Sequence, residues 1–542
     1  MNKYRIIAIA GVFLIVCLTT LRRLNGVLDH DVAVFLTLSK MIAKGRVLYS
    51  DVLDPNTPAM SAVGRLSVRC SELTGVALDQ CHLLVLSLIV AACLGLSSRL
   101  VLRWQGGFNL PSCSFILLAA LTLFVVPGAD FGRREHLMFA CLLPWIVTIL
   151  AQQAFRRSWL EVAAVGIAAG CGLFTKPHFI LFALAIAGFE LHRSQFRLTA
   201  LSRETWLAGL VSISLYSLFL WCEPDFLHRI IPYTVATYGQ YQQGFFAALH
   251  DASPRLLRWV FVVLLALQIK TSIPQPAETT IKPYLQLAWA YMLAGTLIVG
   301  WQGMGFEYHA LPIRLAATMT AGMLALWCWQ QIQNRGPADD PPRGTGEGLS
   351  TIFAAALVGL FLGFAARDLY PDPQDSPRMA MINHPLVKLL NASGPGESAY
   401  FFNSSIASSA RAGVYADTAW AGHMISMYFI PIIADYAQNP HWYPSADGAK
   451  LAEIEHYSRQ RILDDMQRRH PAIVLFDNKA DKWYFKSPQF DYLSFLQQDP
   501  AFSELWERAG YRSDGVVPGL GDEEFQVYRR NPVDQGAEKP PG

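Results

Sequence analysis

The chain has 542 residues, of which 52% are hydrophobic and 16% are charged, and its mean hydropathy is +0.27. Water-soluble domains usually carry about a quarter charged residues, so this composition excludes an ordinary soluble enzyme. The formal net charge is +2, and no basic stripe with interleaved aromatic residues gives a sign of a nucleic-acid partner.

Apolar blocks recur along the first two thirds of the chain and predict about eleven transmembrane helices, because each is long enough to cross about 30 Å of hydrocarbon. They lie at about 5–20, 82–101, 111–127, 137–154, 160–175, 178–190, 205–221, 257–270, 284–300, 312–331 and 349–366. The first block has a basic start, as a signal peptide does, but no small-residue cleavage motif follows it. We interpret it as an uncleaved span. The fifth and sixth blocks, separated only by TKPH, form either two short spans or one broken hairpin.

Lysine and arginine residues in the short loops predict that the N-terminus is cytoplasmic. The loops on the other side hold the chemically unusual residues, and they lie at 21–81, 128–136, 176–178, 222–255 and 301–309. An odd number of spans then places the long C-terminal tail on that same side. The predicted organisation is a transmembrane domain at 1–366 and an extracytoplasmic domain at 367–542.

The tail has a different composition from the rest of the chain. Its runs SAYFFNS, AIVLFDN and EFQVYRR are typical of strands, and GAKLAEIEHYSRQRILDDMQRRHP between them is typical of a helix. This pattern predicts a soluble α/β domain of roughly 170 residues, which is large enough to bury a core of its own.

The nine cysteines do not form a disulfide framework, because most lie inside the apolar blocks and none follows Cys328. Thiols in apolar surroundings are usually small core residues. Cys70 and Cys81 are the pair that an oxidising compartment would allow to join.

The first outer loop begins with Asp29, His30 and Asp31. Either aspartate can cap a helix that runs to Lys44 and ends at Gly45. Apolar residues at helical spacing give this helix one hydrophobic face, and Lys40 and Lys44 can extend to headgroups, so we predict that it lies in the membrane interface. The turn LYSDVLDPNTP, with Asp54, and a second juxtamembrane helix at 58–73 follow.

Two interpretations of Asp29 and Asp31 remain open at this point. In the first, the carboxylates only cap the helix. A cap needs one oxygen acceptor, however, and this site offers two carboxylates and an imidazole. In the second interpretation the acids carry out chemistry, together with charged groups of the other outer loops.

Those other loops contain cations where a plain turn would need none. GADFGRREHLM carries Arg133 and Arg134, which suit a phosphate clamp backed by Glu135 and His136, although a solvated turn is the simpler alternative. LFTKPHFIL places Lys176 between two short apolar runs, where it either lines a site or extends to the surface.

The later loops continue the pattern. WQGMGFEYHALPIR groups Glu307, Tyr308, His309 and Arg314 around glycines, and Arg314 on the first turn of an apolar helix suits an anionic headgroup. IIPYTVATYGQYQQG is rich in tyrosine and glutamine, which suits a sugar or peptide surface but equally an amphipathic interfacial helix.

Taken together, these motifs resemble those of the GT-C integral membrane glycosyltransferases, a superfamily that includes the protein O-mannosyltransferases and the aminoarabinose transferase acting on lipid A. The shared features are an acidic motif directly after the first span, two juxtamembrane helices in that loop, many spans and, in several members, a soluble C-terminal domain. The family's acidic motif is commonly Asp-Glu, whereas this chain has DHD. LYSDVLDPNTP, GRREHL and GMGFEYHALP are similar to stretches of bacterial members, and the resemblance covers roughly residues 1–366.

The resemblance implies a mainly α, polytopic enzyme. The enzyme would move a hexose or a pentose from a polyprenyl-phosphate donor to a hydroxyl of a glycan, lipid or protein, with inversion at the anomeric centre. The reaction would help to build a cell-envelope glycan. Asp29 or Asp31 would be catalytic, and Asp29 is favoured because it aligns with the family's first acid. Cations would stabilise the leaving phosphate: Arg133, Arg134, Lys176, His309 and Arg314. The remaining candidates for substrate binding are His30, Asp54, Glu135, His136, Glu307 and Tyr308.

Other functions are weighed against this one. A lipid-linked sugar flippase would line its path with similar charges, but its ionisable residues should lie near mid-span, whereas here they gather at one face. A membrane-anchored assembly protein would act through its tail, which has no evident catalytic group. No cofactor is expected, since no His or Cys cluster has zinc spacing. Asp29, Asp31 and Glu135 offer oxygen ligands for a divalent cation, without further support.

Overall fold

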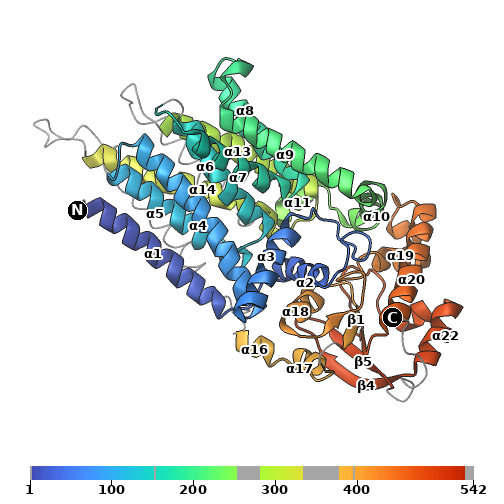
Figure 1. Cartoon of the computed structure of the whole chain (residues 1–542). Helices are drawn as coiled ribbons and strands as arrows, with labels where there is room; N and C mark the ends of the chain where they lie inside the picture. Colours follow the sequence, from blue (N-terminus) through green and yellow to red (C-terminus); the bar gives the residue numbers. More distant parts are fainter. Residues whose placement is uncertain (1–2, 152–153, 253–280, 334–377, 395–396, 532–542) are drawn as a thin grey trace, which may run out of the picture. The chain divides into compact units, whose positions relative to one another are not determined.

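The computed structural model describes residues 3–151, 154–252, 281–333, 378–394 and 397–531 (Figure 1). The chain divides into two compact units. We call Met1–Arg23, Leu83–Leu218 and Gln243–Asp375 the membrane unit, and Leu24–His82, Phe219–Gln242 and Ser376–Gly542 the mixed unit. The first outer loop therefore belongs to the same unit as the C-terminal residues. The predicted domain boundary at 366 lies outside the described residues and stays a prediction.

The membrane unit is a bundle of helices. They are α1 (Lys3–Leu24), α4 (Leu78–Trp104), α5 (Leu110–Phe124), α6 (Arg134–Ala151), α7 (Trp159–Phe174), α8 (Ile180–Arg193), α9 (Arg203–Cys222), α11 (Phe245–Asp251), α13 (Ile281–Gln302) and α14 (Leu311–Gln333). Within the described residues, six helices are long and apolar enough to cross a membrane, and α5 and α7 are shorter apolar helices. The predicted blocks at 257–270 and 349–366 lie outside the described residues. The other blocks are helical, which confirms a multi-pass membrane protein.

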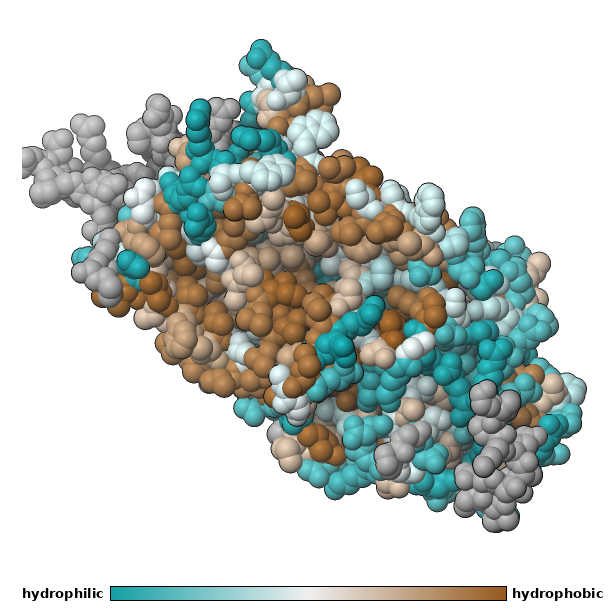
Figure 2. Space-filling view, in the orientation of Figure 1, coloured by the Kyte–Doolittle hydropathy of each residue, from teal (hydrophilic) through white to brown (hydrophobic). Residues whose placement is uncertain are grey.

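Helix α6 is buried along almost its whole length, and α1 is largely exposed. The α1 side chains Ile7, Phe13 and Leu18 are 54%, 68% and 58% exposed. On the face shown in Figure 2, hydrophobic side chains gather over the helices of the membrane unit. Such a contiguous apolar surface is typical of contact with lipid.

The mixed unit contains one five-stranded sheet in the order β2-β1-β3-β5-β4. Its strands are β1 (Ser398–Phe402), β2 (Ala419–Trp420), β3 (Ile473–Asp477), β4 (Tyr511–Pro518) and β5 (Glu524–Arg530). The first three are parallel, and β5 and β4 are antiparallel to their neighbours. The three predicted strands are confirmed as β1, β3 and β5. The prediction missed β2, which has two residues, and β4, whose side chains are mostly exposed as befits an edge strand.

Helices of the C-terminal residues surround this sheet. They are α16 (Arg378–Ile382), α17 (Pro385–Asn391), α18 (Ala407–Tyr415), α19 (Ile430–Gln438), α20 (Gly448–Arg469), α21 (Tyr492–Gln497) and α22 (Pro500–Ala509). The predicted long helix is confirmed as α20, which begins at an Asp447 cap and ends at His470 in the left-handed conformation. The core includes Phe401, Leu475 and Phe525, contributed by β1, β3 and β5.

The first outer loop forms α2 (His30–Ala43) and α3 (Ala59–Thr74), as predicted. Helix α2 is buried on several sides because it packs against both α3 and α18. Lys40 donates from Nζ to the carbonyls of Gly413 and Ala416, at 3.1 and 2.6 Å, and does not extend to headgroups as predicted. Burial, assisted by the charge of Lys44, lowers the pKa of Lys40 to about 8. The face of α2 that carries Lys40 therefore packs against the C-terminal residues and not against a lipid surface.

Cys70 and Cys81 are both free thiols. The pairing that an oxidising compartment would allow is therefore not formed in this structure.

Candidate functional site

The acidic group stands at the start of α2. Asp29 caps the helix, with Oδ1 accepting a hydrogen bond from the backbone N–H of Asp31 at 2.9 Å. His30 lies between the two acids, with Nδ1 3.6 Å from Asp29 Oδ2 and Nε2 3.7 Å from Asp31 Oδ1. The side chains of Asp29, His30 and Asp31 are 10%, 36% and 19% exposed. Capping explains one oxygen of Asp29, and it does not explain the second carboxylate or the imidazole.

Asp54 stabilises its own turn. Its Oδ1 accepts hydrogen bonds from the Asn56 backbone N–H at 3.2 Å and from Asn56 Nδ2 at 2.6 Å. The Tyr49 hydroxyl donates to the Asn56 carbonyl at 2.6 Å. Because Asp54 is engaged in this buried turn, the geometry gives no support for substrate binding by Asp54. That role stays a prediction.

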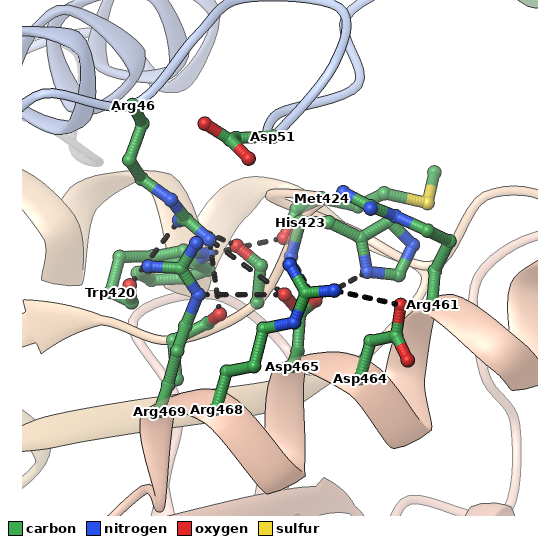
Figure 3. A network of polar contacts seen from close by, with 12 residues as sticks. Arg46, Asp51, Trp420, His423, Met424, Arg461, Asp464, Asp465, Arg468 and Arg469 are labelled. Carbon is green, nitrogen blue, oxygen red and sulfur yellow. Dashed lines mark hydrogen bonds and ion pairs between the residues drawn. The ribbon is translucent and has the colours of Figure 1, made fainter. Parts of the chain in front are cut away.

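The C-terminal residues hold this turn of the first loop by reciprocal arginine contacts. The Arg46 guanidinium donates to the carbonyls of three successive residues, Trp420, Ala421 and Gly422, at 3.3, 3.2 and 2.8 Å (Figure 3). From the other direction, Arg461 of α20 donates to the Ser50 carbonyl at 2.7 Å. No motif in the sequence marks these contacts, because the partners are far apart in the chain.

Asp465 of α20 lies at the centre of the same network (Figure 3). It accepts hydrogen bonds from the His423 backbone N–H at 2.8 Å and from His423 Nδ1 at 2.6 Å. Arg46 Nη2 lies 3.9 Å away. Burial acts to raise the pKa of Asp465, but His423 and the arginines Arg46 and Arg461 lower it overall. The carboxylate is therefore ionised at neutral pH, and Arg46 supplies part of its compensation.

Replacing Arg46 by Met should destabilise the protein by about 3–5 kcal/mol, because it removes one partner of a buried ion pair and leaves backbone carbonyls without a donor. Arg468→Met is the matched control. Its side chain is 73% exposed and lies 3.8 Å from Asp464, so we expect a change within about 0.5 kcal/mol. Thermal unfolding of the purified variants in detergent measures both. Equal midpoints for the two variants would contradict this account of the first loop.

A second group of predicted residues meets in the membrane unit, at the ends of α6, α7 and α13. Lys176 donates from Nζ to Glu135 Oε1 at 3.0 Å and to Gln302 Oε1 at 2.6 Å. Glu135 is 1%, Gln302 6% and Lys176 9% exposed. A buried ammonium needs such partners, and these two fix its position at the ends of three helices.

Asp130 joins two more of the predicted cations. Its Oδ1 lies 3.2 Å from Arg133 Nε, and its Oδ2 accepts from Arg314 Nη2 at 3.3 Å. The guanidinium of Arg133 also lies over the ring of Tyr308, 4.0 Å from its centroid. Arg314 donates further to the Val126 carbonyl at 3.2 Å. Arg133 is thus brought together with Tyr308 and Arg314, which belong to a different loop of the sequence.

His309 and His136 differ in their surroundings. His309 is 6% exposed and lies against Tyr308, with the ring centroids 4.5 Å apart. Both nitrogens of His136 contact backbone instead: Nδ1 accepts from the Gly132 N–H at 3.1 Å, and Nε2 lies 2.9 Å from the Leu123 carbonyl. Substrate binding by His136 therefore stays a prediction without support from the geometry.

We define the cationic cluster by its charged members. They are Arg133, Lys176 and Arg314, with the acids Asp130 and Glu135. Three positive charges against two negative leave an excess of one, which matches a phosphodiester. The predicted residues Arg134 and Glu307 are half-buried and exposed, respectively. Among the described residues, no group of three His, Cys, Asp or Glu side chains could hold a metal ion, and the absence of a cofactor stays a prediction.

A further buried carboxylate, Asp477, stands at the carboxyl end of β3. Burial chiefly, with a contribution from Glu523, raises its pKa from 3.8 to about 6, although Lys482 and the Lys479 N–H oppose the shift. The folded protein then binds this proton more tightly than the unfolded chain. The protonated Asp477 adds about 3 kcal/mol to the free energy of unfolding below about pH 4. This contribution is lost as the pH rises through about 6.

Asp477→Asn should remove this pH dependence and stabilise the protein at pH 7. The amide oxygen can still accept the hydrogen bond from the Lys479 N–H, which lies 3.1 Å from Asp477 Oδ1 in the parent protein. Unfolding midpoints of the two proteins at pH 4, 5, 6 and 7 test it. Parallel pH profiles would show that Asp477 does not titrate in this window.

Comparison with known proteins gives a fold but no sequence relative. No protein-family model and no curated protein matches the chain. The crystal structure of ArnT from Cupriavidus metallidurans bound to undecaprenyl phosphate is similar with a TM-score of 0.56 and 12% identity, over 98% of this chain and 99% of that chain. The apo state of the same protein gives 0.53 and 13%, over 97% of each chain. At such identities the likeness shows the fold, which is the GT-C type that the sequence resemblance predicted.

Proposed function

We propose that this GT-C-fold membrane protein is a glycosyltransferase that moves a sugar from a polyprenyl-phosphate donor to an acceptor hydroxyl. The observation that carries the proposal is the cationic cluster, in which buried and half-buried cations gather at one end of the helices with one positive charge in excess. A solved protein of this fold is bound to undecaprenyl phosphate. A lipid phosphate supplies the anion that such a cluster suits.

The cationic cluster acts on the leaving group. When the sugar leaves, negative charge grows on the phosphate oxygens, and preorganised cations lower the energy of that state. Lys176 is held by Glu135 and Gln302, and Arg133 and Arg314 are held by Asp130. Their positions need little reorganisation as the charge develops. No general acid is required, since a phosphate leaves without a proton.

The acidic group acts on the acceptor. The acceptor hydroxyl attacks the anomeric carbon as its proton passes to Asp29, and the bond from that carbon to the phosphate oxygen breaks with its electron pair leaving on the phosphate. A single displacement inverts the anomeric centre. Retention would need a second carboxylate as nucleophile, a role for which Asp31 is the neighbour. Asp29 takes the base role in this proposal because its position is fixed by the helix cap.

The proposed setting is the inner membrane of a bacterium, with a cytoplasmic N-terminus and the C-terminal residues in the periplasm. The proposed sugar is a hexose or a pentose. A flippase remains the alternative, and the same experiment separates the two, because a flippase moves the donor without cleaving it.

The test uses the full-length protein in proteoliposomes with undecaprenyl phosphates that carry a hexose, a pentose or an aminopentose. We expect cleavage of at least one donor, seen by mass spectrometry as free undecaprenyl phosphate with a released or transferred sugar. Movement of labelled donor across the bilayer with no cleavage of any donor would contradict the proposal and favour the flippase.

A further inference from the structure

The segment 478–491 of the mixed unit is a long irregular connection. Its fourteen residues separate the end of β3 at Asp477 from the start of α21 at Tyr492, and they form neither helix nor strand. The segment begins at the carboxyl end of β3, next to β1. The chain leaves β1 toward β2 on one side, and it then crosses back to β3 on the other side of β1. Ligand sites in sheets with parallel strands gather at such an edge, and irregular connections of this length are usually functional.

Hydrogen bonds to a buried carboxylate hold this segment in place. Asp435 of α19 is fully buried and accepts hydrogen bonds from the backbone N–H groups of Lys486 and Ser487, at 2.7 and 3.0 Å, and from the Ser487 hydroxyl at 2.6 Å. The Tyr443 hydroxyl donates to the same carboxylate at 3.0 Å. Four hydrogen bonds to one buried carboxylate indicate a pinned segment.

The pinned segment holds Tyr484 in an unusual conformation. Its φ is +71°, a region that bulky side chains rarely occupy, and such strain persists where the surroundings impose it. The conformation directs the Tyr484 ring against Tyr238 and Tyr241, with centroids 5.7 and 4.8 Å apart. The preceding residue, Trp483, has 59% of its surface exposed.

We call Tyr238, Tyr241, Trp483 and Tyr484 the aromatic patch. The aromatic patch and the acidic group belong to the same compact unit. Burial chiefly, with a smaller contribution from the negative charge of Asp31, raises the pKa of the Tyr484 phenol. An exposed tryptophan can also anchor a protein at a lipid interface. The neighbours here are other phenols and charged residues such as Asp481 and Lys486, which are both exposed. These surroundings favour a ligand that is polar at its rim and apolar on its face.

We propose that the aromatic patch binds the acceptor of the transfer reaction, and that this acceptor is a saccharide. A pyranose has an apolar C–H face that can stack on the Trp483 indole, and hydroxyls at its rim that the tyrosine hydroxyls can bind. Binding there holds an acceptor hydroxyl near Asp29 and Asp31. The inference rests on the proposed function and deepens it by naming the acceptor class, with Trp483 as the residue that positions it.

The experiment compares Trp483→Ala with Trp483→Phe and with Val516→Ala, an exposed apolar residue on β4 that is 52% exposed. Fluorescently tagged hexose and N-acetylhexosamine oligosaccharides, two to four residues long, serve as acceptors, and a Ser/Thr-containing peptide serves as the comparison. We expect Trp483→Ala to raise the KM for an oligosaccharide about tenfold, with little change in kcat. The rate of donor hydrolysis without acceptor should not change. Trp483→Phe should recover most of the KM, and Val516→Ala should match the parent protein.

The outcomes separate this inference from the proposed function. Failure of the parent protein to cleave any donor would overturn the proposed function. Normal donor cleavage with an unchanged oligosaccharide KM in Trp483→Ala would overturn the aromatic patch alone. Glycosylation of the peptide alone would also overturn the aromatic patch. So would a Trp483→Ala variant in which donor hydrolysis falls as much as transfer does.

Discussion

Asp29→Asn should lower sugar transfer by about 10²–10⁴-fold, the usual contribution of general base catalysis, while the protein remains folded. Asparagine caps helices as well as aspartate does, so the hydrogen bond from the Asp31 N–H to residue 29, at 2.9 Å, is kept. The substitution removes the negative charge that takes the proton in the proposed mechanism. Transfer rates with a saturating donor measure the loss, and the thermal midpoint checks the fold.

Asp31→Asn is the matched control for this prediction. Asp31 lies in the first turn of α2 and does not cap it, and its carboxylate is 3.7 Å from His30 Nε2. We expect a smaller loss than for Asp29→Asn. A larger loss in Asp31→Asn would move the base to Asp31, and full turnover in both variants would remove the acidic group from the mechanism.

Lys176→Met should weaken binding of undecaprenyl phosphate by about 10- to 100-fold, since a hydrogen bond to a charged group contributes about 1.5–3 kcal/mol. The same change leaves Glu135 buried without its ion-pair partner, which costs about 3–5 kcal/mol of stability. Binding and folding are therefore both affected by the single variant, and a second variant must separate them.

The double variant Lys176→Met with Glu135→Gln provides that separation. It removes the unpaired charge, so we expect the thermal midpoint to recover most of the loss. Affinity for undecaprenyl phosphate should stay low, because the cation is still missing. Binding is measured by titration of the lipid into the detergent-solubilised protein. A double variant that binds as tightly as the parent would exclude Lys176 from the phosphate site.

The sequence by itself determined the features that depend on local periodicity and on local hydrogen bonds. Long apolar blocks predicted the spanning helices of the membrane unit, and short strand-like runs predicted β1, β3 and β5, because burial of an element depends on its own composition. The helix after DHD and a cap by Asp29 or Asp31 followed from residues within a few positions of one another, and the structure places the cap at Asp29. The edge strand β4 was missed, since YRSDGVVP has no apolar alternation to mark it.

Tertiary structure alone decided which charged residues meet. Lys176 is 41 positions from Glu135 and 126 positions from Gln302, and nothing local in LFTKPHFIL specifies either partner. The sequence predicted that Lys40 extends to headgroups, yet the carbonyls of Gly413 and Ala416 bind it. Buried charges must find compensation wherever the fold brings it. That requirement is set by packing between distant segments, so the residues were visible in the sequence and their partners were not.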